Sequence, residues 1–195
     1  MDAIIKNSLE YFPIRANFGN DLVLGETVTG LAVSCINSDT GISSLASMID
    51  WESPSSPEII MGLKGGVDQE HHIITVLATT SLGNEYPREI HVFIYDGIQD
   101  TFSKKSTGIL TFLADLTKEI ESGDSVASYT VTATQVSTQL DATSAVVSGS
   151  SRSSAKVYVG VTGGVALEDY DITVRMTTSY GYKYTRVVRM SVRDI

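Results

Sequence analysis

The sequence has few of the residues that hold small domains together covalently or through metals. Cys35 is the only cysteine among 195 residues, so neither a disulfide within the chain nor a cysteine-based zinc site is possible. A chain without such links depends on packing alone, which is consistent with folding in a reducing cytoplasm. The hydrophobic content of 42% and charged content of 19% are typical of globular domains.

Basic residues are scarce in the first half of the chain. Residues 1–96 contain 13 acidic and 4 basic residues, a net charge of −9, whereas residues 97–195 contain 10 of each and are neutral. Binding to a nucleic-acid backbone requires clustered Lys and Arg. The sequence also has no run of about 18 apolar residues, as a membrane helix requires, and Met1–Phe12 lacks a secretory pattern. We therefore expect neither a nucleic-acid partner nor a membrane.

Motifs for catalysis and cofactor binding are missing as well. There is no Gly-x-Ser-x-Gly elbow and no phosphate-binding Gly-x-x-x-x-Gly-Lys run, and the second half has no histidine. His71 and His72 are adjacent and point to opposite faces of a strand, so they do not converge on a metal, although His91 is able to approach one of them. The acidic clusters lack the spacing of a calcium loop. We predict no catalytic, cofactor or metal site, and a protein that is not an enzyme.

What the sequence does contain is an internal repeat at an offset of about 98 residues. The copies share glycine pairs, turn residues and apolar alternation. The repeated segments are Leu63–Val67 with Val161–Val165, Thr79–Ser81 with Thr177–Ser179, and Asp96 with Asp194. The repeat predicts two small domains in tandem, residues 1–98 and residues 99–195.

Apolar and polar residues alternate along most of each copy, in runs rich in Val, Ile, Thr and Tyr that indicate β-strands. The clearest pairs of runs are Thr27–Cys35 with Ser125–Ala133, Glu58–Leu63 with Lys156–Val161, His72–Thr80 with Tyr170–Thr178, and Arg88–Tyr95 with Arg186–Arg193. We expect six or seven strands in each copy, enough for a β-sandwich. We interpret Ser148–Ser154 as a mobile loop, and Asp96–Thr107 as a linker or the first edge of the second domain.

In the last two strands of each copy, every second residue is apolar, and we assign these residues to the core. Residues of this set have the inward parity, and the residues between them have the outward parity. The outward parity differs between the copies. The first copy has Ile73, Leu77, Phe93 and Tyr95 where the second has Asp171, Arg175, Ser191 and Arg193. We predict that the apolar outer face of the first copy docks onto the other copy, a second chain or a different protein. The alternatives are that a loop of the same domain, residues 37–57, covers it, or that the face is simply exposed to solvent.

The second copy has two candidate binding features of its own. Arg175, Arg189 and Arg193 share the outward parity and would form a basic patch for an acidic partner, unless they are only a solvated face. Tyr180 and Tyr182 flank Gly181 in the last hairpin, where tyrosines suit recognition. The alternative is that they pack on the edge of the domain.

The repeated motifs resemble a family of bacteriophage structural modules with an immunoglobulin-like fold, the fibre–tail adaptor or minor virion proteins. The shared pattern is a Gly-acid turn, a strand ending in Gly-Gly, a strand ending in Thr-Thr-Ser-x-Gly, and a last strand that closes on an aspartate. The matching residues are Gly25-Glu26 and Gly123-Asp124, Gly65-Gly66 and Gly163-Gly164, Thr79–Gly83 and Thr177–Gly181, and Asp96 and Asp194. The first copy departs from the pattern, because Phe93-Ile94-Tyr95 precedes its aspartate rather than a valine.

The resemblance implies an all-β fold of two tandem immunoglobulin-like β-sandwiches. It also implies a non-enzymatic virion structural protein at the tail, neck or fibre junction, made in the host bacterial cytoplasm and present in several copies per particle. Its partners would be other virion proteins, with no cofactor. A capsid decoration protein is one alternative. The other is a host-surface adhesin or carbohydrate-binding module that uses Tyr180 and Tyr182.

Overall fold

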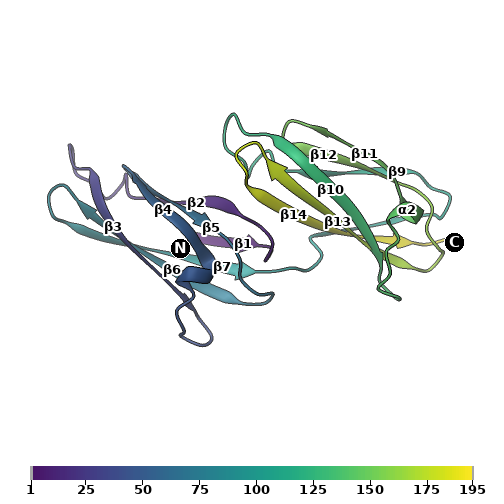
Figure 1. Ribbon diagram of the computed structural model, residues 1–195, viewed down its shortest axis with the longest axis horizontal. Coiled ribbons are helices and arrows are strands. Elements are labelled where there is room, and N and C mark those ends of the chain that lie inside the picture. The colour runs from purple at the N-terminus through teal and green to yellow at the C-terminus, as the bar shows by residue number, and fades with distance from the viewer. Residues whose placement is uncertain (1, 195) are drawn as a thin grey trace. The chain divides into compact units, whose positions relative to one another are not determined.

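The computed structural model describes residues 2–194, and it divides the chain into two compact units between Asp96 and Gly97 (Figure 1). The domain boundary expected from the repeat, between residues 98 and 99, lies two residues further along the chain and stays a prediction. We describe each unit by itself.

The first unit is almost entirely β-structure. Its strands are β1 (Asp2–Lys6), β2 (Phe12–Asn17), β3 (Val28–Asn37), β4 (Ile49–Ser55), β5 (Glu58–Leu63), β6 (His71–Thr80) and β7 (Glu85–Ile94). One sheet has the order β1-β7-β6-β3 and the other has the order β2-β5-β4. A single turn of helix, α1 (Leu45–Met48), leads into β4.

The second unit repeats this arrangement element by element. Its strands are β8 (Asp100–Lys104), β9 (Leu110–Asp115), β10 (Val126–Gln135), β11 (Val147–Ser153), β12 (Lys156–Val161), β13 (Asp169–Thr178) and β14 (Lys183–Val192), with a helical turn α2 (Thr143–Val146) before β11. The sheets have the orders β10-β13-β14-β8 and β11-β12-β9. The two helices have four residues each, and no helix between residues 2 and 194 has the length and apolar character to cross a membrane.

The strand order identifies the fold of both units. The third, sixth and seventh strands form one sheet, and the second, fourth and fifth form the other, which is the division found in immunoglobulin domains. The first strand joins the larger sheet and runs parallel to the last strand, as β1 does beside β7. The predicted fold class, two tandem immunoglobulin-like β-sandwiches, is therefore confirmed.

Each unit has its own core, formed by alternate side chains of the facing sheets. The inward parity predicted for the last two strands is buried in both copies. The buried side chains are Ile74, Val76, Ala78, Ile90, Val92 and Ile94 in the first unit, and Ile172, Val174, Met176, Val188, Met190 and Val192 in the second. Since the side-chain period of a strand is two, this parity fixes which residues face outward.

In each copy a buried lysine forms a hydrogen bond with the turn that contains the glycine pair, Gly65-Gly66 or Gly163-Gly164. Lys6 ends β1 and donates from Nζ to the carbonyl oxygens of Asn7 and Gly65, at 2.8 and 2.6 Å. Lys104 ends β8 and donates to the carbonyl oxygen of Gly163 at 2.7 Å. Burial lowers the pKa of Lys6 to about 8 and also lowers that of Lys104. Because both lysines are nearly inaccessible to solvent, the contact is structural.

Residues 148–154 differ from the sequence prediction, whereas the segment after Asp96 matches one of its two interpretations, the first edge of the second domain. Residues 148–154, expected as a mobile loop, are mostly the edge strand β11, which pairs with β12. Six of its seven residues are exposed, so apolar alternation was not needed for it to be a strand. The segment that follows Asp96 contains β8, so it supplies the first strand of the second unit rather than only a linker.

Candidate partner-binding surfaces

The outward residues of the β1-β7-β6-β3 sheet form an apolar surface on the first unit. Phe93 lies opposite His71 on β6 and Ile5 on β1, and Ile73 lies opposite Ile36 on β3. Phe93 is 40% exposed and Ile5 is 73% exposed. We call Ile5, Ile36, Ile73 and Phe93, together with the histidines between them, the apolar face.

The structure separates the four side chains that the sequence grouped. Ile73, Phe93 and Tyr95 lie at the same end of the sheet, where Tyr95 follows β7 and is exposed. Leu77 points to the same side but pairs with Pro87, six residues further along β6 than His71. At about 3.3 Å per residue it lies about 20 Å from the Phe93 pair. Leu77 therefore lies outside the cluster that Ile73, Phe93 and Tyr95 form.

No loop of the first unit hides the apolar face in the described part of the chain. Residues 37–57 form a turn, α1 and β4, and β4 belongs to the opposite sheet. The turn contacts the face at His71, where the amide of Ser38 donates to the carbonyl oxygen of His71 at 2.8 Å, and it leaves Phe93 40% exposed. Residues 37–57 therefore do not cover Phe93, contrary to the alternative interpretation of the sequence.

Two histidines occupy the middle of the apolar face. His71 Nε2 lies 2.9 Å from His91 Nδ1, and His71 Nδ1 lies 2.8 Å from the hydroxyl of Ser38. The His71 ring stacks on Phe93 with centroids 4.2 Å apart. His72 points the other way, is buried, and contacts Ser44 and Glu70. Hydrogen bonding and stacking thus hold the partly buried pair His71 and His91 in place.

The histidine pair has no third ligand at hand. Among residues 2–194 no group of three or more His, Cys, Asp or Glu side chains is placed to hold a metal ion.

The same face of the second unit is polar, and its charges are paired internally. Arg189 donates to both carboxylate oxygens of Asp171, at 2.7 and 2.9 Å, and Arg193 donates to Asp169 at 2.6 Å. Asp171 raises the pKa of Arg189. Arg175 is exposed on the same face. The three arginines therefore form a surface of ion pairs with one further cation, rather than the uniformly basic patch that their parity suggested.

The tyrosines of the last hairpin lie at one end of the second unit. Tyr180 is 54% exposed, and its ring meets that of Tyr182 edge to face, with centroids 6.4 Å apart. The Tyr180 amide is 3.2 Å from the carboxylate of Asp124. Tyr184 is buried and donates to the carbonyl oxygen of Glu119. Two aromatic rings are thus available at this end, but they stand at 84° and do not share a plane.

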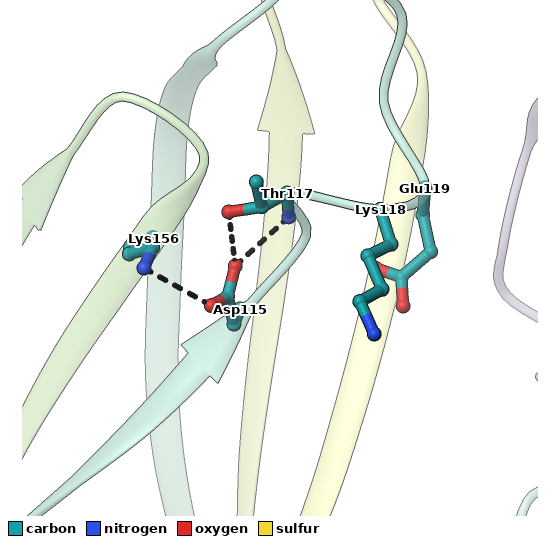
Figure 2. A pocket seen from close by; sticks show the side chains of 5 residues that line it. All are labelled: Asp115, Thr117, Lys118, Glu119 and Lys156. Carbon is teal, nitrogen blue, oxygen red and sulfur yellow. Dashed lines mark hydrogen bonds and ion pairs between the residues drawn. The ribbon is translucent and has the colours of Figure 1, made fainter.

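A cavity of about 320 Å³ lies where β9 ends, lined by five polar residues (Figure 2). The Asp115 carboxylate accepts hydrogen bonds from the amide and hydroxyl of Thr117, at 2.8 and 2.5 Å, and lies 3.2 Å from Lys156 Nζ. These bonds, led by those of Thr117, lower the pKa of Asp115 to about 2. A carboxylate that stays ionised in this way stabilises the turn at Thr117 through its hydrogen bonds and is poorly suited to transferring a proton.

Comparison with known proteins relates the second unit to phage proteins. Residues 104–191 match the family model described as podophage GP4 fiber-tail adaptor protein gp77. No curated protein matches the chain in sequence.

The solved structures that resemble the chain are tandem immunoglobulin domains. A chimeric titin Z1Z2 is 9% identical, with a TM-score of 0.36, and the match covers 100% of this chain and 94% of that one. The Ig1-2 module of the Drosophila receptor protein tyrosine phosphatase DLAR is 9% identical, with a TM-score of 0.32 and coverages of 99% and 95%. Because these scores are low, the fold assignment rests on the strand order.

The family match covers almost the whole second unit, from the end of β8 to the end of β14. The first unit shares the repeated turns but lies outside the match. Residues 104–191 therefore carry the sequence pattern of a podophage fibre–tail adaptor family, and the resemblance inferred from the repeated motifs is confirmed there.

Proposed function

We propose that this chain is a structural protein of a bacteriophage tail, which connects tail or fibre components through protein–protein contacts and catalyses no reaction. The observation that carries the proposal is the match of residues 104–191 to a fibre–tail adaptor family. The apolar face supports it, since the face exposes Phe93 and Ile5 on a rigid sheet. Exposed apolar surface of this kind is a feature of protein-binding sites.

The two units would have different tasks in such a connector. Their cores, glycine turns and buried lysines are alike, whereas their outer faces differ at each position of the apolar face. Ile5, Ile73 and Phe93 correspond to Ser103, Asp171 and Ser191. The first unit would supply the apolar contact, and the second would supply contacts of another kind.

Measuring where the protein resides in the particle tests the proposal. Heads and tails of the phage that encodes the chain are separated, and the chain is quantified in each by mass spectrometry with a labelled standard. We expect it in the tail fraction, at a fixed ratio to the tail proteins. Recovery with the heads would indicate the capsid decoration role instead, and absence from particles would reject both.

A host-surface carbohydrate-binding role is the second candidate, supported by the exposed Tyr180 and Tyr182. Sugars stack on flat aromatic surfaces, and the edge-to-face packing of these rings offers less of such a surface. A glycan array with the intact chain and with Tyr180→Ala and Tyr182→Ala tests it. Glycan binding that both substitutions abolish would favour this role over the connector.

A further inference from the structure

The edge strand β9 of the second unit has less protection than its counterpart β2 in the first unit, since its one charged residue, Asp115, is the last of the strand. Both strands end the smaller sheet of their unit, where one side of the strand has no neighbouring strand. Edge strands usually carry proline or charge, which prevents another chain from pairing with them. β2 has both, Pro13 and an Arg15 that pairs with Glu58. At the same positions β9 has Thr111 and Leu113.

Pro13 also shows which backbone groups of β9 face the open side. A proline has no N–H, so within a sheet it lies where its nitrogen points away from the neighbouring strand. Pro13 is opposite Gly62 of β5, and Thr111 is opposite Gly160 of β12 in the matching register. The N–H and C=O groups of Thr111 and Leu113 therefore point to the open side. Outside the β9–β12 ladder, these groups have no backbone partner among residues 2–194.

Core side chains are partly uncovered along this edge. Leu110 and Phe112 have the inward parity, yet Leu110 is 42% exposed and Phe112 is half-buried, whereas Ile14, the counterpart of Phe112, is buried. A cavity of about 310 Å³ opens beside Phe112 between β9 and β14. Its apolar lining is Phe112, Leu113, Ala114 and Val188, and its polar lining is Gln99, Asp100, Asp115 and Arg186. On the outer face Leu113 lies opposite Tyr158, and both are exposed.

We propose that the open edge of β9 binds an extended segment of a partner protein by β-strand addition. Only an extended backbone satisfies the alternating donors and acceptors of Thr111 and Leu113. The segment would place one side chain in the cavity, with its apolar part against Phe112 and Val188, and its neighbours beside Leu113. That the segment belongs to a tail protein rests on the proposed function, but the affinity of the edge for an extended chain does not.

A second copy of β9 fits this edge less well than a free segment. In a β9–β9 pair the inward residues of the added strand, Phe112 and Ala114, would already belong to the core of their own unit. They would not enter the cavity of the other copy, and both cavities would stay unfilled. A segment with both faces free is able to fill the cavity while it pairs.

The test measures binding of the full chain to a fluorescein-labelled peptide of alternating valine and threonine with serine-rich ends. Thr111→Pro removes the edge N–H, and the matching Pro13 shows that the fold accepts proline there. Thr111→Ala retains the N–H and serves as the control. We expect Thr111→Pro to weaken binding by at least about tenfold and Thr111→Ala to leave it unchanged. The peptide should slow hydrogen exchange at the amides of Thr111 and Leu113.

Three results would overturn the proposal: no binding, equal binding to both variants, or exchange protection at another strand edge. A concentration-dependent dimer that Thr111→Pro abolishes, without peptide binding, would assign the edge to a second copy and reject the partner segment. If Thr111→Pro does not fold, Leu113→Arg, which copies Arg15, replaces it with the same expected loss. None of these outcomes depends on whether the protein is found in tails.

Discussion

At the scale of single residues, the second glycine of each repeated pair has a demanding environment. Gly66 has a φ of +91°, and an added Cβ would lie 2.6 Å from the side chain of Ile94. Gly83 also has a positive φ, +80°, but an added Cβ would meet nothing within 4 Å. A substitution at Gly83 therefore tests backbone strain alone, whereas a substitution at Gly66 tests backbone strain and steric overlap together.

We expect Gly66→Ala to lower the free energy of unfolding of the first unit by about 2–4 kcal/mol, because it adds overpacking to a left-handed backbone. Gly83→Ala should cost about 1–2 kcal/mol, since only the backbone term applies. Urea denaturation of the two variants measures the difference. Equal losses would show that Ile94 and its neighbours move aside at no cost.

Lys6 makes the stability of the first unit depend on alkaline pH. Its pKa is about 8 when folded and 10.5 in the unfolded reference, because burial disfavours the charged form. Between these values the unfolded chain binds the proton that the folded chain has lost, so stability rises with pH. We expect unfolding of the intact chain to become more costly, relative to Lys6→Met, on going from pH 8 to pH 10. A constant difference between the two proteins would contradict the lowered pKa.

The sequence predicts the direction of side chains better than their contacts. Alternation places Ile73, Leu77 and Phe93 outward because the period of a strand is fixed. It does not give the register between strands, on which the His71–His91 bond and the Arg189–Asp171 pair depend. The burial of Lys6 and Lys104 was also missed, although their separation equals the repeat offset.

At the scale of elements, strands with strong apolar alternation were predictable and exposed edge strands were not. β5, β6 and β7 lie close to their predicted ranges because one face of each is buried. β11 is rich in Ser and Gly and is held by pairing with β12, so it has no burial pattern to detect. The open edge of β9 was not predictable from the sequence either. It becomes apparent only when β9 is compared with its counterpart β2.

Asp115 links the end of β9 to the following turn, and its lowered pKa gives an acid-side prediction. The folded pKa of about 2 lies below the reference value of 3.8, so the contribution to stability is complete above pH 3.8 and is lost as the pH falls toward 2. Asp115→Asn should therefore make the free energy of unfolding of the second unit less dependent on pH between pH 3.8 and pH 2. Denaturation series at pH 4 and pH 2.5 measure it, and parallel losses in both proteins would contradict the assignment.

At the scale of the whole molecule, two similar cores carry two dissimilar surfaces. Each unit has seven strands within residues 2–194 and its own buried interior. The repeat predicts that residues 1–98 and 99–195 fold separately. We expect each fragment, expressed alone, to give a cooperative urea transition and a β-sheet circular dichroism spectrum. A fragment that folds only when mixed with the other would show that the boundary or the independence is wrong.

The apolar face makes the most direct test of the connector account, because the second unit supplies a matched control. Phe93→Asp places a charge in the apolar face, and Ser191→Asp places the same charge at the equivalent position of the polar face. Both side chains point outward, but Ser191 lies opposite Asp169, so circular dichroism must first show that each variant is folded. The measurement is the number of copies of each variant in purified tails, relative to the unchanged chain. The account predicts a strong loss for Phe93→Asp and normal incorporation of Ser191→Asp; normal incorporation of a folded Phe93→Asp protein would contradict it.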